Sequence, residues 1–132
     1  MGRFYYGDIE GKFWFGVQDS FDADNFGVEG EVIVDEDGEM RMVAYDFTKD
    51  HLHLIEGGIF DCEEEIGGQL ELLDKFFSEK DGYTYLEVKE FLGMDSVEDV
   101  KELLGYYSRL HLGRKILACV KESGSCSFEG EL

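Results

Sequence analysis

The sequence predicts a single α+β domain of 132 residues: an N-terminal antiparallel meander of about four strands, two to three helices packed on one face, and a C-terminal strand. Turns rich in glycine and aspartate divide the first 47 residues into short aromatic or β-branched runs, which are typical of strands. Within residues 52–77 and 103–120, apolar residues recur every three or four positions, as in an amphipathic helix. Cys126 and Phe128 alternate with polar residues, which indicates a last strand, with an edge of the meander as one place for it.

The first two strands are expected over Arg3–Tyr6 and Lys12–Val17, because aromatic residues favour strands and the glycines of Gly7–Gly11 suit a hairpin turn. Since side chains alternate along a strand, both faces of this hairpin carry aromatic residues. Two interpretations follow. Either both faces are covered within the chain, the second by a helix, or Tyr5 and Trp14 form an exposed platform for a ligand or a protein.

Residues 19–27 are rich in Asp, Asn and Ser, which favour turns, so we expect a loop anchored by Phe21 and Phe26. The Asp-Gly pair in the turn Asp35–Gly38 is a hairpin signal. The strands that this turn joins are expected over Glu31–Val34 and Glu39–Phe47.

Two helices are expected near residues 49–65 and 68–80, with a kink or break at Gly67-Gly68, because internal glycine weakens a helix by about 0.5–1 kcal/mol relative to alanine. Residues 86–92 suit a helical turn or two, which Gly93 would end.

A long helix is expected over residues 96–122, with Ser96 as its N-cap and Gly124 just past its end. The alternative is a break at Gly113 followed by a strand at 115–121, since that segment also alternates.

The formal net charge is −19, from 31 acidic and 12 basic residues. A field of this sign repels nucleic acids and anionic membranes, so the balance disfavours direct nucleic-acid binding and favours a protein partner with a basic surface. The charge is uneven, because residues 1–39 carry −9 and residues 101–121 carry +4. Either the basic segment complements an acidic neighbour within the fold or a helix C-terminus, or it forms a local anion site.

Three cysteines without a paired spacing favour a reducing intracellular compartment, such as the cytoplasm. No segment has the roughly 20 apolar residues of a membrane span, and the N-terminal residues lack the pattern of a secretory signal.

No metal or cofactor is expected. Asp22, Asp24 and Gly27 fall at positions 1, 3 and 6 of a calcium-binding EF-hand loop, but Phe26 and Ile33 occupy two of the ligand positions. The three cysteines and three histidines lack zinc-ligand spacing. Motifs of hydrolases, P-loops, dinucleotide-binding folds and zinc proteases are absent from the sequence, so no catalytic residue is nominated.

Three segments resemble a family of short, acidic proteins of unassigned activity from large DNA viruses and environmental sequences. They are GRFYYGDIEGKFWFGVQ at 2–18, the D-x-x-D-A-D-x-F-G run at 19–27, and ILACVKESGSCSFEGEL at 116–132. The resemblance covers both ends of the chain and transfers no catalytic residue. It implies a viral protein that acts inside an infected host cell.

The favoured hypothesis is an acidic protein-interaction module that binds a basic or nucleic-acid-binding partner, in its strongest form by mimicry of nucleic acid. A small-molecule or nucleotide site is the alternative, with the aromatic hairpin stacking on the ligand and cations binding an anionic group. A homo-oligomer, a homodimer included, that pairs through an edge strand or an uncovered aromatic face is a further alternative. The candidate binding residues for these hypotheses are Tyr5, Trp14, Asp35, Asp37, Glu39, Glu63, Glu64, Glu65, Arg109, Arg114 and Lys115.

Overall fold

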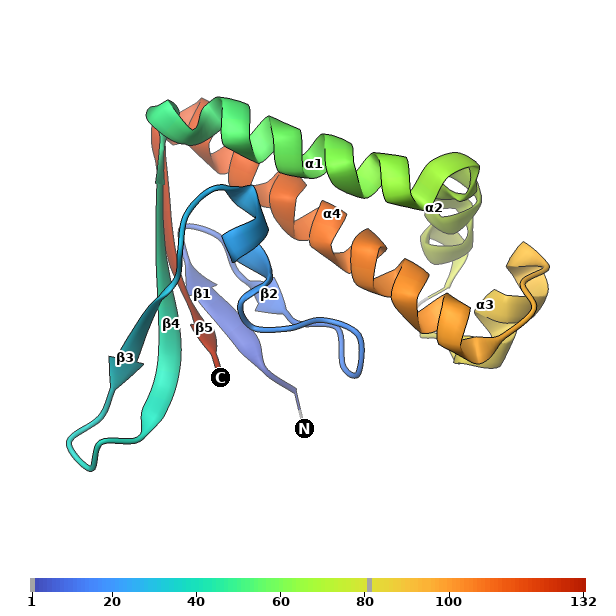
Figure 1. Ribbon diagram of the computed structural model, residues 1–132, viewed down its shortest axis with the longest axis horizontal. Coiled ribbons are helices and arrows are strands. Elements are labelled where there is room, and N and C mark those ends of the chain that lie inside the picture. Colours follow the sequence, from blue (N-terminus) through green and yellow to red (C-terminus); the bar gives the residue numbers. More distant parts are fainter. Residues whose placement is uncertain (1, 81) are drawn as a thin grey trace.

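The computed structural model describes residues 2–80 and 82–132 and confirms the α+β fold. Five antiparallel strands form one sheet in the order β2-β1-β5-β4-β3, and the helices lie on one side of it (Figure 1). The strands are β1 (Phe4–Gly7), β2 (Gly11–Lys12), β3 (Glu31–Val34), β4 (Met40–Thr48) and β5 (Ser125–Glu131). The helices are α1 (Leu52–Ile66), α2 (Leu70–Glu79), α3 (Tyr85–Leu92) and α4 (Val97–Ser123), with 3₁₀ segments η1 (Asp22–Phe26), η2 (Lys49–His51) and η3 (Gly67–Gln69).

The second strand is much shorter than expected. The hydrogen bond from the Phe13 amide to the Arg3 carbonyl ends the pairing, and the chain then turns through Gly16, whose φ is +80°. Phe13 is buried whereas Phe15 is 72% exposed, so these two side chains do not share a strand face. The prediction of a strand over Lys12–Val17 is therefore wrong beyond Lys12, because the chain turns there, with the Trp14 carbonyl accepting the amides of Val17 and Gln18.

The C-terminal strand β5 lies in the centre of the sheet, between β1 and β4, and not at an edge. The four N-terminal strands form as two hairpins, β1–β2 and β3–β4, which β5 joins, so they are not a continuous meander. The physical reason is the ring of Phe128, which stacks on Tyr45 and Phe47 at centroid distances of 5.3 and 6.3 Å and meets Tyr5 edge-on at 5.9 Å. Phe128 on β5 thus completes an aromatic core between the two hairpins.

The predicted helices are confirmed, with small shifts at their ends. Gly67 ends α1 with φ of +63°, which accounts for the break before α2. Ser96 caps α4 by accepting the Asp99 amide, and Gly124 follows its last residue in the left-handed conformation. Helix α4 continues through Gly113, so the alternative of a strand at 115–121 is wrong.

Two glycines allow the loop before β3 to reach the helix pair. The ring of Phe26 in η1 is fully buried between α1 and α4, where a Cβ on Gly58 or Gly113 would lie 2.6 or 2.5 Å from the ring. Gly113 therefore belongs inside a continuous helix because it makes room for this ring. Phe26 anchors the loop as predicted, but Phe21 remains 37% exposed and anchors it little.

Adjacent glycines of α1 should respond oppositely to alanine. Gly58→Ala is expected to lower the free energy of unfolding by about 2 kcal/mol, because the new methyl group would overlap Phe26 and the backbone oxygen of Asn25. Gly57→Ala should raise it by about 0.5–1 kcal/mol, because nothing lies within 4 Å of its Cβ position and alanine favours the helix. Urea unfolding of both variants measures the difference. Equal effects at the two positions would contradict the packing of Phe26 in this slot.

Candidate functional site

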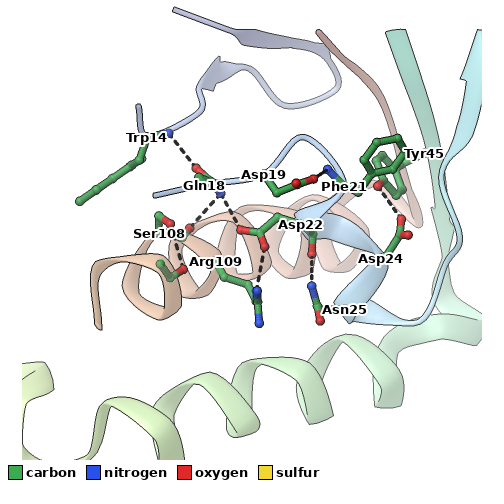
Figure 2. A network of polar contacts seen from close by, with 11 residues as sticks. Trp14, Gln18, Asp19, Phe21, Asp22, Asp24, Asn25, Tyr45, Ser108 and Arg109 are labelled. Carbon is green, nitrogen blue, oxygen red and sulfur yellow. Dashed lines mark hydrogen bonds and ion pairs between the residues drawn. The ribbon is translucent and has the colours of Figure 1, made fainter. Parts of the chain in front are cut away.

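A polar network ties the loop after β2 to helix α4 (Figure 2). The side-chain oxygen of Gln18 accepts the Trp14 amide, and its Nε2 donates to Asp22 Oδ2 at 3.1 Å and to the Ser108 carbonyl at 3.4 Å. Arg109 Nε donates to Asp22 Oδ1 at 2.8 Å, and the Asp22 side chain is only 4% exposed. Gln18, Asp22 and Arg109 therefore form one buried connection between segments that are distant in sequence.

Burial raises the pKa of Asp22, while the adjacent Arg109 and the hydrogen bond from Gln18 act in the opposite direction. Arg109 is accordingly committed to an internal ion pair. For this residue the structure matches the first interpretation of the basic segment, an acidic neighbour within the fold, because the guanidinium Nε donates to Asp22.

The other two candidate cations are placed differently. Lys115 Nζ donates to the Tyr5 hydroxyl at 2.8 Å and to the Glu10 carbonyl at 3.1 Å, so it links α4 to the β1–β2 hairpin. Arg114 is exposed at the preceding position of the helix. Arg109 and Lys115 line two different clefts of the molecule, so the three cations do not act together at one site.

The exposed aromatic platform is wrong for Tyr5, which is 4% exposed because it faces the core beside Phe13 and Phe128. Trp14 is half-buried against Phe77, Tyr83 and Tyr107. Tyr5 and Trp14 nevertheless meet at a cleft of about 400 Å³, which Lys115 also lines. The structure thus brings together three predicted residues in a cleft that the sequence did not reveal.

The predicted acidic residues lie at two distant ends of the molecule. Asp35, Asp37 and Glu39 form the tip of the β3–β4 hairpin, whereas Glu63–Glu65 belong to the last turn of α1, at the opposite end in Figure 1. Asp35 is engaged locally, since its carboxylate accepts the amides of Asp37 and Glu39 and pairs with Arg41 at 2.8 Å. These contacts, the pair with Arg41 foremost, lower the pKa of Asp35. The two clusters therefore do not form one surface.

A different acidic surface is formed by the side of the sheet that the helices leave open (Figure 1). We call it the outer face. Its side chains are Phe4 and Tyr6 of β1, Ser127, Glu129 and Glu131 of β5, Met42, Ala44 and Asp46 of β4, and Glu31 and Ile33 of β3. One row across four strands consists of Tyr6, Glu129, Ala44 and Glu31, and the next contains Glu131, Met42 and Ile33.

The charge of the outer face is strongly one-sided. It carries four carboxylates, whereas the five strands contain only two cations, Lys12 and Arg41, and only Lys12 is in register with this face. Phe4 and Tyr6 lie beside the carboxylates, and the Tyr6 hydroxyl donates to Glu131 at 3.2 Å. The sequence alone does not reveal this surface, because its side chains come together only when β5 lies in the sheet between β1 and β4.

Other chemical signals are few in the described residues. The cysteines are free thiols, and burial raises the pKa of Cys62 to about 11. Residues 2–80 and 82–132 contain no group of three histidine, cysteine or carboxylate side chains arranged to hold a metal ion. None of the helices in these two ranges combines the length and the apolar character that crossing a membrane requires.

Comparisons with protein-family models, with curated proteins and with solved structures gave no match for this chain. The resemblance to proteins of large DNA viruses therefore stays a prediction.

Proposed function

We propose that the chain is an intracellular, acidic protein-interaction module whose outer face binds a basic, arginine-rich segment of a partner protein. The observation that carries this proposal is the open side of the sheet, where four carboxylates share one face with the exposed rings of β1, those of Phe4 and Tyr6. The carboxylates are Glu31, Asp46, Glu129 and Glu131. Free cysteines support the intracellular assignment, because paired disulfides are the usual state outside the cell.

Arginine fits the outer face better than lysine does. A guanidinium group binds a carboxylate through two parallel hydrogen bonds and also stacks on aromatic faces. The outer face offers both contacts within one row, since Tyr6 and Glu129 are cross-strand neighbours. Charge of opposite sign also speeds association and selects the partner.

A nucleic-acid-binding protein is the strongest form of such a partner. Its binding surface is built to accept a regular array of phosphates, and carboxylates of the outer face would take their place. Adjacent strands are about 4.8 Å apart. Glu129 and Glu31 lie on either side of Ala44 in one row, so their backbones are separated by roughly 10 Å. Self-association through this face is disfavoured, because two copies would bring carboxylates against carboxylates.

The test is the affinity for a fluorescein-labelled peptide of nine arginines, measured by fluorescence anisotropy. Glu31→Gln/Glu129→Gln should weaken binding at least tenfold, because it removes two carboxylates from the outer face. The matched control Glu63→Gln/Glu64→Gln removes the same charge from α1 and should change the affinity less than twofold. Equal weakening by the two double variants would show that the peptide responds only to net charge and would contradict the proposal.

A second arm compares nine arginines with nine lysines at the same charge. Stacking on Phe4 and Tyr6 predicts tighter binding of the arginine peptide, and Phe4→Ala should reduce this preference. Identical affinities for both peptides would show that the aromatic rings take no part in recognition.

A further inference from the structure

The cleft that Tyr5, Trp14 and Lys115 share lies on the helix side of the sheet, away from the outer face. Three parts of the fold form its walls: the β1–β2 hairpin with the loop that follows, helix α2, and one face of α4. The face of α4 is built from Tyr107, Ser108, His111, Leu112 and Lys115, which follow one another at helical spacing. The volume of about 400 Å³ is within the range of small-molecule sites.

One side of the cleft is aromatic. Trp14 packs edge-on against Phe77 at a centroid distance of 5.1 Å and against Tyr107 at 5.8 Å, and Tyr107 meets His111 at 4.5 Å. Because Trp14 is only half-buried and lines the cleft, part of its ring remains open to a ligand. A flat ring that stacks on such a wall gains binding free energy from the contact.

The other side of the cleft is cationic. Lys115 Nζ is held in place by the Tyr5 hydroxyl and the Glu10 carbonyl, and an ammonium group has three N–H donors, so one remains for a ligand. Arg114 adds a second positive charge nearby, since its charge acts to lower the pKa of both Tyr107 and His111. Asp74 also lines the cleft, but its Oδ1 accepts the Tyr107 hydroxyl at 2.7 Å. A local excess of positive charge stands out in a chain of net charge −19.

His111 lies between these two sides. Burial lowers its pKa, with further lowering by Arg114 and Lys115, so its imidazole is neutral at pH 7 and offers one donor and one acceptor. Within residues 2–80 and 82–132, no hydrogen bond engages its ring nitrogens, although the ring is partly buried. A polar ligand group that enters the cleft finds this donor unoccupied.

We infer that the cleft binds a small aromatic phosphate, with the ring against the open part of Trp14 and the phosphate at Lys115 and His111. The chemistry is shared by nucleoside monophosphates and aryl phosphates. A dianionic phosphate accepts hydrogen bonds from the fixed ammonium and from the imidazole N–H together, whereas an aromatic ligand without a phosphate does not. The carboxylates of the outer face do not line this cleft, although Lys12, which is in register with the outer face, does.

The chain reports on this site directly, because its single tryptophan is Trp14. Titration with AMP and with phenyl phosphate should change Trp14 fluorescence in a saturable manner. Adenosine and inorganic phosphate should each bind at least tenfold more weakly, since each has only one of the two groups. If inorganic phosphate binds as tightly as AMP, or if no probe changes the fluorescence up to millimolar concentration, the inference is overturned.

Lys115→Met should weaken AMP binding at least tenfold while keeping the aliphatic stem of the side chain. The matched control is Lys121→Met, which removes the same charge from α4 outside the cleft and should leave the affinity within twofold. Equal losses in the two variants would show that AMP responds to overall charge and would overturn the assignment.

A measurement on the unaltered protein avoids dependence on a variant that folds poorly. A bound phosphate stabilises the imidazolium, so saturating AMP should raise the pKa of His111, followed by NMR of the ring protons, whereas adenosine should not. His51 and His53 lie outside the cleft and serve as internal references. No shift at His111 under saturation would place the phosphate elsewhere.

Discussion

Arg109→Met should lower the free energy of unfolding by about 3 kcal/mol at pH 7, because the variant leaves the carboxylate of Asp22 buried with Gln18 as its only remaining side-chain donor. Removing one partner of a buried ion pair is more costly than the pair is stabilising. Arg114→Met is the matched control, since it removes the same charge from an exposed position on the same helix and should change stability by less than about 0.5 kcal/mol.

The effect should depend on pH in a defined direction. The pKa of Asp22 is raised above its ordinary value of 3.8 by burial, and loss of Arg109 raises it further. Between the unfolded and the folded pKa the native state binds more protons, so stability falls as pH rises through this window. The deficit of Arg109→Met relative to the unaltered protein should therefore shrink as pH falls from 7 towards 4. Urea unfolding across this range measures it, and a deficit independent of pH would exclude Asp22 as its origin.

Phe26→Ala should destabilise the fold by about 3–5 kcal/mol, because the ring is fully buried between α1 and α4 and its removal leaves a cavity. Phe21→Ala in the same loop should cost less than about 1 kcal/mol, since Phe21 is partly exposed. Chemical unfolding followed by circular dichroism compares the two. Similar losses of unfolding free energy at both positions would mean that the loop as a whole, and not the packing of Phe26 between α1 and α4, determines the stability.

A double-variant cycle makes this prediction sharper. Gly113→Ala should destabilise the unaltered protein, in which its methyl group would meet the Phe26 ring at 2.5 Å. In the Phe26→Ala background the ring is gone and the new methyl group is crowded mainly by Ile59 Cγ1 at 3.0 Å, so the same substitution should destabilise much less. A smaller loss in the double variant is the expected result, and equal effects in both backgrounds would contradict direct contact.

The helices could be predicted because their signals are local. The apolar period, the cap at Ser96 and the glycines that end α1 and α4 act within a few residues of the places that they determine. Strand order is not local. Alternation around Phe128 identifies β5 as a strand, but its neighbours depend on how that ring fits among Tyr45, Phe47 and Tyr5, and these residues come from both hairpins.

The candidate sites were predictable to the same extent. Lys115 and Trp14 could be selected as chemical types, but only the fold shows that they share a cleft. Likewise, only the fold shows that Arg109 forms an ion pair with Asp22, 87 residues away. The acidic residues within 35–39 and 63–65 could be predicted as clusters because they are close together in the sequence. The carboxylates of Glu31, Glu129 and Glu131 are scattered in sequence, and only the register of β5 with its neighbours assembles them.

The central position of β5 has a consequence for the order in which the protein is completed. The contact between Phe4 and Glu131 joins residues 127 positions apart, so the sheet closes only after β5 has been synthesised. Until then the β1–β2 and β3–β4 hairpins each present an unpaired edge where β5 will insert. During that interval both unpaired strand edges can pair with other chains. The many like charges of the chain repel neighbouring copies and so oppose this aggregation.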